Sequence, residues 1–309
     1  MGGGVTPYLV RRLSWAVLTM LGISIINFVL IYAVPVSPAR MIVGIHAPES
    51  TVLAVQRALG LDRPLYVQYG IFLWNLVHLN LGYSYMDNRP VMGMIGQAFG
   101  NTARLAAAAF IAEVLIGGTL GYVAALRRGR WIDRMLSLAG LVGMSIPNYW
   151  LGSMLLLVFA FMVPIFPLYG QGLPSLVLPA LTIGLTGAAW YMRVLRTSLV
   201  EIMTSDHVRT AKAKGLSGWA VNVRHVLRNG LIPVVTLAGL DLAGMLSGIV
   251  IIETVFGWPG IGELAYQAVQ NLDIPVVMGT VLYTTLVIVV LNLAVDVLYA
   301  MLDPRVRYS

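Results

Sequence analysis

The chain has 309 residues, of which 58% are hydrophobic and only 11% are charged, with a mean hydropathy of +0.82. A soluble domain carries about 25% charged residues, so the composition excludes an ordinary soluble protein and indicates an integral membrane protein. The formal net charge of +7 is then explained by basic cytoplasmic loops rather than by nucleic-acid binding. There is no cysteine, and the four histidines are scattered, so we expect no disulfide, no metal site and no catalytic residue in this chain.

Six apolar stretches are long enough to cross a membrane, which takes roughly 20 residues. Arg11 and Arg12 precede the first stretch, which is too long for the core of a cleaved signal peptide, so we expect a retained helix. The third stretch contains Pro147, which removes a backbone donor and should kink the helix. We therefore predict an all-α, polytopic membrane protein with six transmembrane helices, at residues 14–34, 103–126, 135–162, 176–194, 234–253 and 278–302.

Basic residues set the predicted orientation. With the N-terminus inside, fifteen of the twenty Lys and Arg residues fall in cytoplasmic segments, and five fall in or beside the first outer segment. This asymmetry predicts that both termini are cytosolic. The outer five are Arg40, Arg57, Arg63, Arg89 and Arg104.

The spans divide the chain in sequence order. We expect an N-terminal tail and first span at 1–34, an outer lobe at 35–102, a five-helix core at 103–302 and a cytosolic tail at 303–309. Within the lobe, residues 49–60 have the pattern of a short amphipathic helix that ends at Gly60. Aromatic residues are frequent from 66 to 85, which favours a small packed lobe at the membrane surface.

A polar, basic island at 206–233 lies between two apolar stretches, inside a predicted cytosolic loop at 201–233. Ser205 and Asp206 are good N-cap residues for a helix that continues to Lys214, and Gly215 can end it in a left-handed conformation. A second helix is expected from about 218 until just before Pro233. Taken alone, this pattern fits equally a lever that docks on a soluble partner and a basic loop on anionic lipid headgroups.

Several strings, in order along nearly the whole chain, resemble the permease subunits of peptide/nickel-type ABC importers. The long segment between the first two spans resembles the B-type subunit of the permease pair. The strings are LGLDRPLYVQY (59–69), LGYS (81–84), RPV (89–91), SIPNYW (145–150), RTAKAKGL (209–216), RHVLRN (224–229), ETVFGWPG (253–260) and DPRVR (303–307).

The resemblance implies that the island is the loop that couples the permease to an ATPase. In ABC permeases this loop generally carries Glu-Ala-Ala, three residues and Gly; here Arg209-Thr210-Ala211 precede Gly215, as in the peptide/nickel branch. The general pattern also has an apolar residue and a Pro downstream, where this chain has His225 and Arg228. The implied coupling residues are Asp206, Arg209, Thr210, Ala211, Lys212, Gly215, Leu216, Arg224, His225 and Arg228.

The resemblance also implies a type I ABC importer permease fold, a cytoplasmic (inner) membrane location and a set of partners. These are a second homologous permease, one or two ATPase subunits, an extracytoplasmic binding protein and membrane lipid, without nucleic acid. The chain has no phosphate-cradling Gly-x-x-x-x-Gly-Lys-Ser/Thr loop, so ATP and Mg²⁺ would be bound by the partner ATPases and no cofactor by this chain.

An ion-gradient-driven secondary transporter is the alternative, but we find no paired broken helices or inverted repeat. A membrane enzyme is disfavoured because no nucleophile, base or metal ligands cluster.

Carboxylates inside predicted spans are costly and usually face a cavity or a partner group. Glu113 and Asp241 lie deep, and the pathway and helix-packing interpretations of both stay open. Glu253 precedes the Gly- and Pro-rich turn that holds Trp258, and we place both at the outer mouth of the pathway as candidates. Hydrogen bonding to nearby backbone is the alternative for Glu253.

The substrate is the least constrained prediction. The strings at 64–84 resemble peptide-type and nickel-type members alike. The short loop at 164–174 lacks the long insertion of dipeptide permeases, which favours nickel, metal-chelate or oligopeptide types. Without Cys or intramembrane His, a metal would pass as a chelate rather than as a bare ion.

Overall fold

The computed structural model describes residues 5–33, 38–44, 46–58, 60–170, 172–246 and 248–302, and at 5–10, 31–33, 38, 41 and 295–302 it describes the backbone alone. The predicted C-terminal tail and its DPRVR string lie outside these residues. Within them the chain is helical, and the only strand-like feature is an isolated bridge between Tyr83 and Pro90. The all-α prediction is confirmed.

Among the described residues, four helices are long and apolar enough to cross a membrane, and two bent helix pairs raise the number to six if each pair is one span. The first bent pair turns by 95° at Ile146–Pro147, as Pro147 predicts. The second turns by 41° near Leu231, just before Pro233. The predicted six-span architecture is thus confirmed, although several boundaries move.

The chain forms two compact units, residues 1–101 with 259–309, and residues 102–258. These units cut across the division predicted in chain order, because the last helix packs along the first one. The boundary falls inside one long helix, α5.

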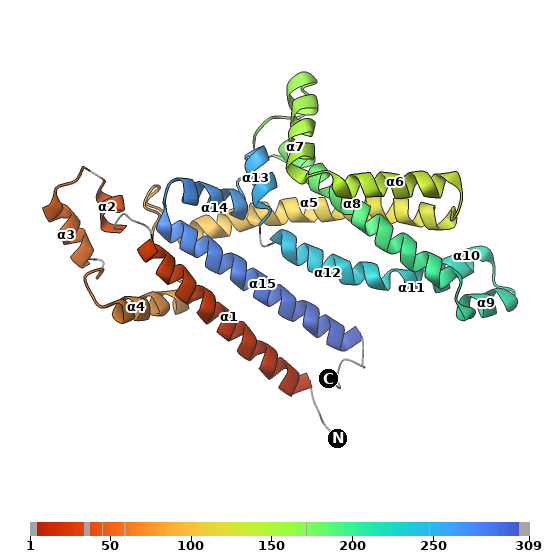
Figure 1. Ribbon diagram of the computed structural model, residues 1–309, viewed down its shortest axis with the longest axis horizontal. Coiled ribbons are helices and arrows are strands. Elements are labelled where there is room, and N and C mark those ends of the chain that lie inside the picture. The colour runs from red at the N-terminus through yellow and green to blue at the C-terminus, as the bar shows by residue number, and fades with distance from the viewer. Residues whose placement is uncertain are drawn as a thin grey trace. The chain divides into compact units, whose positions relative to one another are not determined.

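The first unit holds α1 and α15, which run side by side, with α14 packed on α15 (Figure 1). Asn27 of α1 is buried and donates to the Met278 carbonyl of α15 over 3.0 Å, so a polar contact fixes this apolar pair. Gly60 follows α3 with φ +68°, as predicted for its end. The helices of the first unit are α1 (Val5–Ala33), α2 (Pro38–Val43), α3 (Glu49–Ala58), α4 (Leu65–Val77), the start of α5 (Val91–Leu126), α14 (Ile261–Gln270) and α15 (Ile274–Leu302).

The second unit is built on the long helix α8, which α5, α6, α7, α12 and α13 contact. Small residues allow the closest approach: a Cβ on Gly117 of α5 would lie 2.6 Å from the Tyr191 Cβ, and one on Gly121 would lie 2.7 Å from the Met192 carbonyl oxygen. The spacing Gly117-x-x-x-Gly121 thus forms a packing face of α5 toward α8. The remaining elements are α6 (Trp131–Ser145), α7 (Asn148–Leu156), the π-helix Leu157–Met162, α8 (Leu173–Met203), α9 (Asp206–Ala213), α10 (Gly218–Ala220), the π-helix Val221–Leu227, α11 (Arg228–Gly230), α12 (Ile232–Leu246) and α13 (Val250–Phe256).

Two boundary predictions were wrong. The helix of the second span begins at Val91 rather than 103, because Val91, Ile95 and Ala98 form a buried stripe that keeps the chain helical through three glycines. The fifth span ends at Leu246 rather than 253, and Gly248, with φ +116°, separates it from α13. Gly244 and Gly248 line a cavity that is described below.

Candidate functional site: a basic surface helix and a membrane cavity

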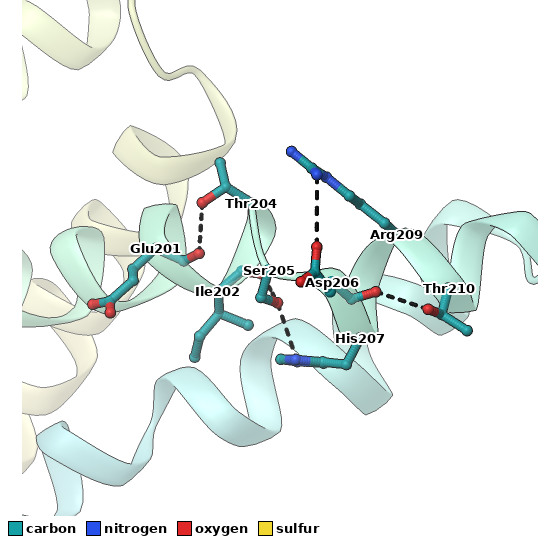
Figure 2. A network of polar contacts seen from close by, with 8 residues as sticks. All are labelled: Glu201, Ile202, Thr204, Ser205, Asp206, His207, Arg209 and Thr210. Atoms are coloured by element: carbon teal, nitrogen blue, oxygen red, sulfur yellow. Dashed lines mark hydrogen bonds and ion pairs between the residues drawn. The ribbon is translucent and has the colours of Figure 1, made fainter.

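The first part of the basic island folds as a short helix, α9, at the end of α8 (Figure 1). Ser205 occupies the N-cap position, as predicted, but its hydroxyl donates back to the Ile202 carbonyl at 2.6 Å instead of capping α9. Thr204 likewise donates to the Glu201 carbonyl at 2.8 Å. Figure 2 shows these hydrogen bonds at the junction between α8 and α9, where they hold the connecting residues against the end of α8.

Two buried side chains attach α9 to the rest of the unit. Val208 is 1% exposed and Ala211 is 5% exposed, and both belong to an apolar cluster with Leu199 of α8 and with Val221 and Val226. Burying one valine side chain contributes about 1.5–3 kcal/mol. This apolar contact fixes the position of α9 against α8.

The opposite face of α9 is exposed and basic. Arg209, Lys212 and Lys214 are exposed, and Arg209 makes only a 3.6 Å exposed contact with Asp206 one turn earlier. Such pairs contribute about 0.2–0.5 kcal/mol, so the arginine is available to a partner. Thr210 donates to the Asp206 carbonyl within the helix.

The end of α9 follows the prediction. Gly215 has φ +80°, and its amide donates to the Lys212 carbonyl at 3.0 Å. Beyond it, Leu216, one of the predicted coupling residues, is 40% exposed, and Trp219, which was not predicted, is 73% exposed. Of the remaining predicted residues, Arg224 and Arg228 are exposed, and His225 is half-buried.

An ion pair between α6 and α8 was also missed. The Arg196 guanidinium of α8 donates to both Asp133 oxygens at 2.5 and 2.8 Å, and the Gly129 amide donates to the same carboxylate at 2.9 Å. The pair ties the loop between α5 and α6 to α8. The sequence signal was a lone Asp among the basic residues of that loop.

A cavity of about 580 Å³ lies among α5, α6, α8 and α12. That volume is within the range of small-ligand sites, about 300–1,000 Å³. Glu113 and Asp241, two of the four predicted pathway residues, line it together with Trp190. A second cavity of about 520 Å³ also has Trp190 in its wall and continues along α8 past Arg193 to Glu201.

The other two predicted pathway residues lie elsewhere. Glu253 is fully buried and accepts a 2.7 Å hydrogen bond from Thr102, and Trp258 is 3% exposed in an apolar cluster with Phe256. Neither is among the residues that line the two cavities. Gly257, which lies between Glu253 and Trp258 in the chain, has φ +56° and ends α13. It forms the tight turn that was predicted at this position. That these residues border the pathway stays a prediction.

In the described part of the chain, no three His, Asp or Glu side chains come together as metal ligands would. The expectation that this chain binds no metal stays a prediction, as does the expectation that it binds no cofactor.

The structure thus combines apolar helices of membrane-spanning length, a cavity lined by α8, and an exposed basic helix at the end of α8. Residues 117–308 match the family described as "Binding-protein-dependent transport system inner membrane component", and residues 5–106 match the N-terminal family of the same membrane component. The chain belongs to this family and is a permease subunit of an ABC importer.

Relatives extend over the full length of the chain. A putative peptide transport system permease protein of Brucella abortus (strain 2308) is 36% identical over 314 residues, covering 99% of this chain and 100% of its own. The glutathione transport system permease protein GsiC of Escherichia coli (strain K12) is 37% identical over 303 residues, covering 98% and 99%. The crystal structure of an amino acid ABC transporter with histidines is similar in fold, with a TM-score of 0.50, 16% identity, and coverage of 69% of this chain and 94% of that one.

Proposed function

We propose that this chain forms half of a translocation pathway for short peptides and couples it to separate ATPase subunits through α9. The observation that carries the proposal is that one continuous helix, α8, supplies both the wall of the cavities and the attachment of the lever. Trp190 faces the cavities, Leu199 packs under α9, and the break at Thr204–Ser205 is closed by hydrogen bonds. A push on α9 is therefore passed along α8 to the cavity wall.

The peptide substrate is inferred from the relatives, whose names are peptide and glutathione transport permeases. In the proposed assembly, a second permease completes the pathway, one or two ATPases dock on the basic face of α9, and an extracytoplasmic binding protein delivers cargo. The chain itself would be non-catalytic, with ATP and Mg²⁺ bound by the ATPases. We place it in the cytoplasmic membrane with both termini cytosolic, following the charge asymmetry.

Affinity purification of the tagged chain from its native membrane in gentle detergent tests the assembly. Co-elution of a second permease and one or two ATPases is the expected result. A chain that elutes alone, or only with itself, would overturn the proposal. Uptake into proteoliposomes by the recovered complex, compared between trialanine and a nickel chelate in the presence of ATP, then tests the substrate; uptake of the chelate alone would contradict a peptide pathway.

A further inference from the structure

Two carboxyl groups share the larger cavity without a basic residue beside them. Glu113 comes from α5 and is 2% exposed, and Asp241 comes from α12 and is half-buried. Both line the 580 Å³ cavity, and none of its other described lining residues is Lys, Arg or His. Two acidic groups at membrane depth with no counter-ion are costly, so such groups usually mark a ligand or ion pathway.

The hydrogen bonds to these groups leave acceptor capacity unused. Asp241 accepts one bond, from the buried Tyr191 hydroxyl at 3.0 Å. The Glu113 Oε2 atom is buried and has no hydrogen-bond partner. The two carboxyl groups also lie close enough to interact with each other. A carboxylate offers about four acceptor positions, so this pair can receive several more donors from one bound group.

The backbone opposite Glu113 leaves room for its carboxyl group. A Cβ atom at Gly187 of α8 would overlap the Glu113 carboxyl group, so only glycine permits this position. Trp190, one helical turn further along α8, is 54% exposed and lines the same cavity. An indole face attracts cations, so it adds a third favourable surface to the two carboxyl groups.

We propose that Glu113 and Asp241 form a site for the ammonium group of a transported peptide, with Trp190 as its aromatic wall; this deepens the proposed function and rests on it. An ammonium has three donors, which match the unused acceptors, and one positive charge, which compensates one of the two negative charges of the ionised pair. A divalent metal ion fits less well, because no third His, Asp or Glu joins the two carboxyl groups among the described residues.

Equilibrium binding to the purified complex of permeases and ATPases, without binding protein, tests the site directly. The probes are trialanine and N-acetyl-trialanine, which differ only at the N-terminus, where acetylation replaces the ammonium group by a neutral amide. A hydrogen-bonded charged group contributes about 1.5–3 kcal/mol, so trialanine is expected to bind about 10- to 100-fold more tightly than its acetylated form. In D241N and E113Q this preference should collapse to less than about 3-fold, which is under 1 kcal/mol.

D241N keeps an oxygen that accepts from the Tyr191 hydroxyl, so the fold should be preserved even if E113Q assembles poorly. D62N, which removes an exposed carboxylate outside the cavity, is the matched control and should retain the full preference. Equal binding of the two probes by the wild-type complex, or no binding of trialanine, would overturn the site. This outcome is distinct from a failure of the proposed function, which would appear as absent partners or absent uptake.

Discussion

Ser84 and Asp273 are joined by a buried hydrogen bond of 2.5 Å, although 189 residues separate them in the chain. Asp273 lies in the turn between α14 and α15, and it also accepts from the Tyr85 amide at 3.1 Å. The Ser84 hydroxyl accepts in turn from the Met86 and Asp87 amides at 3.2 and 2.9 Å. One carboxylate thus fixes the loop before α5 against the turn before α15.

Replacing Asp273 by Ala should destabilise this unit by about 1–3 kcal/mol, because the buried Ser84 hydroxyl and the Tyr85 amide would lose their acceptor. Thermal unfolding in detergent measures the loss. D87A removes an exposed carboxylate three residues from Ser84 and serves as the control. Equal unfolding temperatures for D273A and D87A would show that the bond adds nothing.

Tyr85 makes the same region sensitive to alkali. Burial, and then the nearby negative charge of Asp273, raise the pKa of Tyr85 to about 12. The unfolded chain loses this proton near pH 10, so the stability that the neutral phenol contributes is complete below pH 10 and declines between pH 10 and 12. The unfolding temperature should fall more steeply over this window in the wild type than in Y85F, and Y66F, at an exposed tyrosine, should behave as the wild type does. Parallel curves for wild type and Y85F would refute this.

Much of the fold could be predicted from the length of the apolar stretches and from the proline and glycine residues that bend or end helices. Pro147 predicted the sharpest bend, and Gly215 predicted the end of α9. The start of α5 could not be predicted, because Gly93, Gly96 and Gly100 each lower helix propensity by about 1 kcal/mol relative to Ala. The buried stripe of Val91, Ile95 and Ala98 outweighs this cost, and burial of that stripe depends on α14 and α15 at the far end of the chain.

The two parts of the candidate site also differ in how well the sequence predicts them. The coupling helix is local, so its cap, its basic residues and its end were visible in one short string. The cavity is not local: Gly117 and Gly187 allow α5, which carries Glu113, to approach α8, and the Tyr191 hydroxyl of α8 bonds Asp241 of α12. Glu253 had the same residue type and a similar apolar context, yet it lies in a hydrogen bond with Thr102 away from the cavities. Carboxylates in spans mark candidates, and tertiary packing decides which of them face open space.

The α5–α8 contact should be sensitive at one glycine and tolerant at its neighbour. A methyl group at Gly117 would come within 3.0 Å of the Ala188 Cα and closer still to the Tyr191 Cβ, whereas one at Gly118 would meet nothing within 4 Å. G117A is therefore expected to cost about 1–3 kcal/mol through forced separation of the helices, and G118A less than about 0.5 kcal/mol. Thermal unfolding in detergent of the two single variants gives the comparison. A G117A protein as stable as G118A would mean that the helices separate freely.

Reversing the charge of Arg209 and Lys212 should weaken docking of the ATPase subunits. Both side chains are exposed on α9, so the change alters a surface and not the packing. An exposed pair contributes about 0.2–1 kcal/mol, and reversal of two charges should lower the affinity about 10-fold, with a steeper effect at low salt. Pull-down of the ATPases by the R209E/K212E variant measures this. The control is R128E/R130E, at exposed arginines of the loop between α5 and α6; docking weakened equally by both pairs would point to general membrane-surface charge instead.

Gly215 offers the sharpest test of coupling. There is room for a side chain at this position, but the backbone is in the left-handed conformation that favours glycine. Its φ is +80°, and no atom lies within 4 Å of the position that a Cβ would take, so a valine there would cause no clash. The side chain would nevertheless disfavour the left-handed conformation by about 1–2 kcal/mol. The chain leaving α9 would then take another direction, and the exposed tip at Leu216 and Trp219 would leave its docking position.

G215V should therefore insert and assemble normally but lose substrate-stimulated ATP hydrolysis, measured on the purified complex. G218V, three residues later and equally uncrowded, lacks the left-handed backbone and should keep the stimulation. Normal stimulation in G215V would remove the coupling role from this loop.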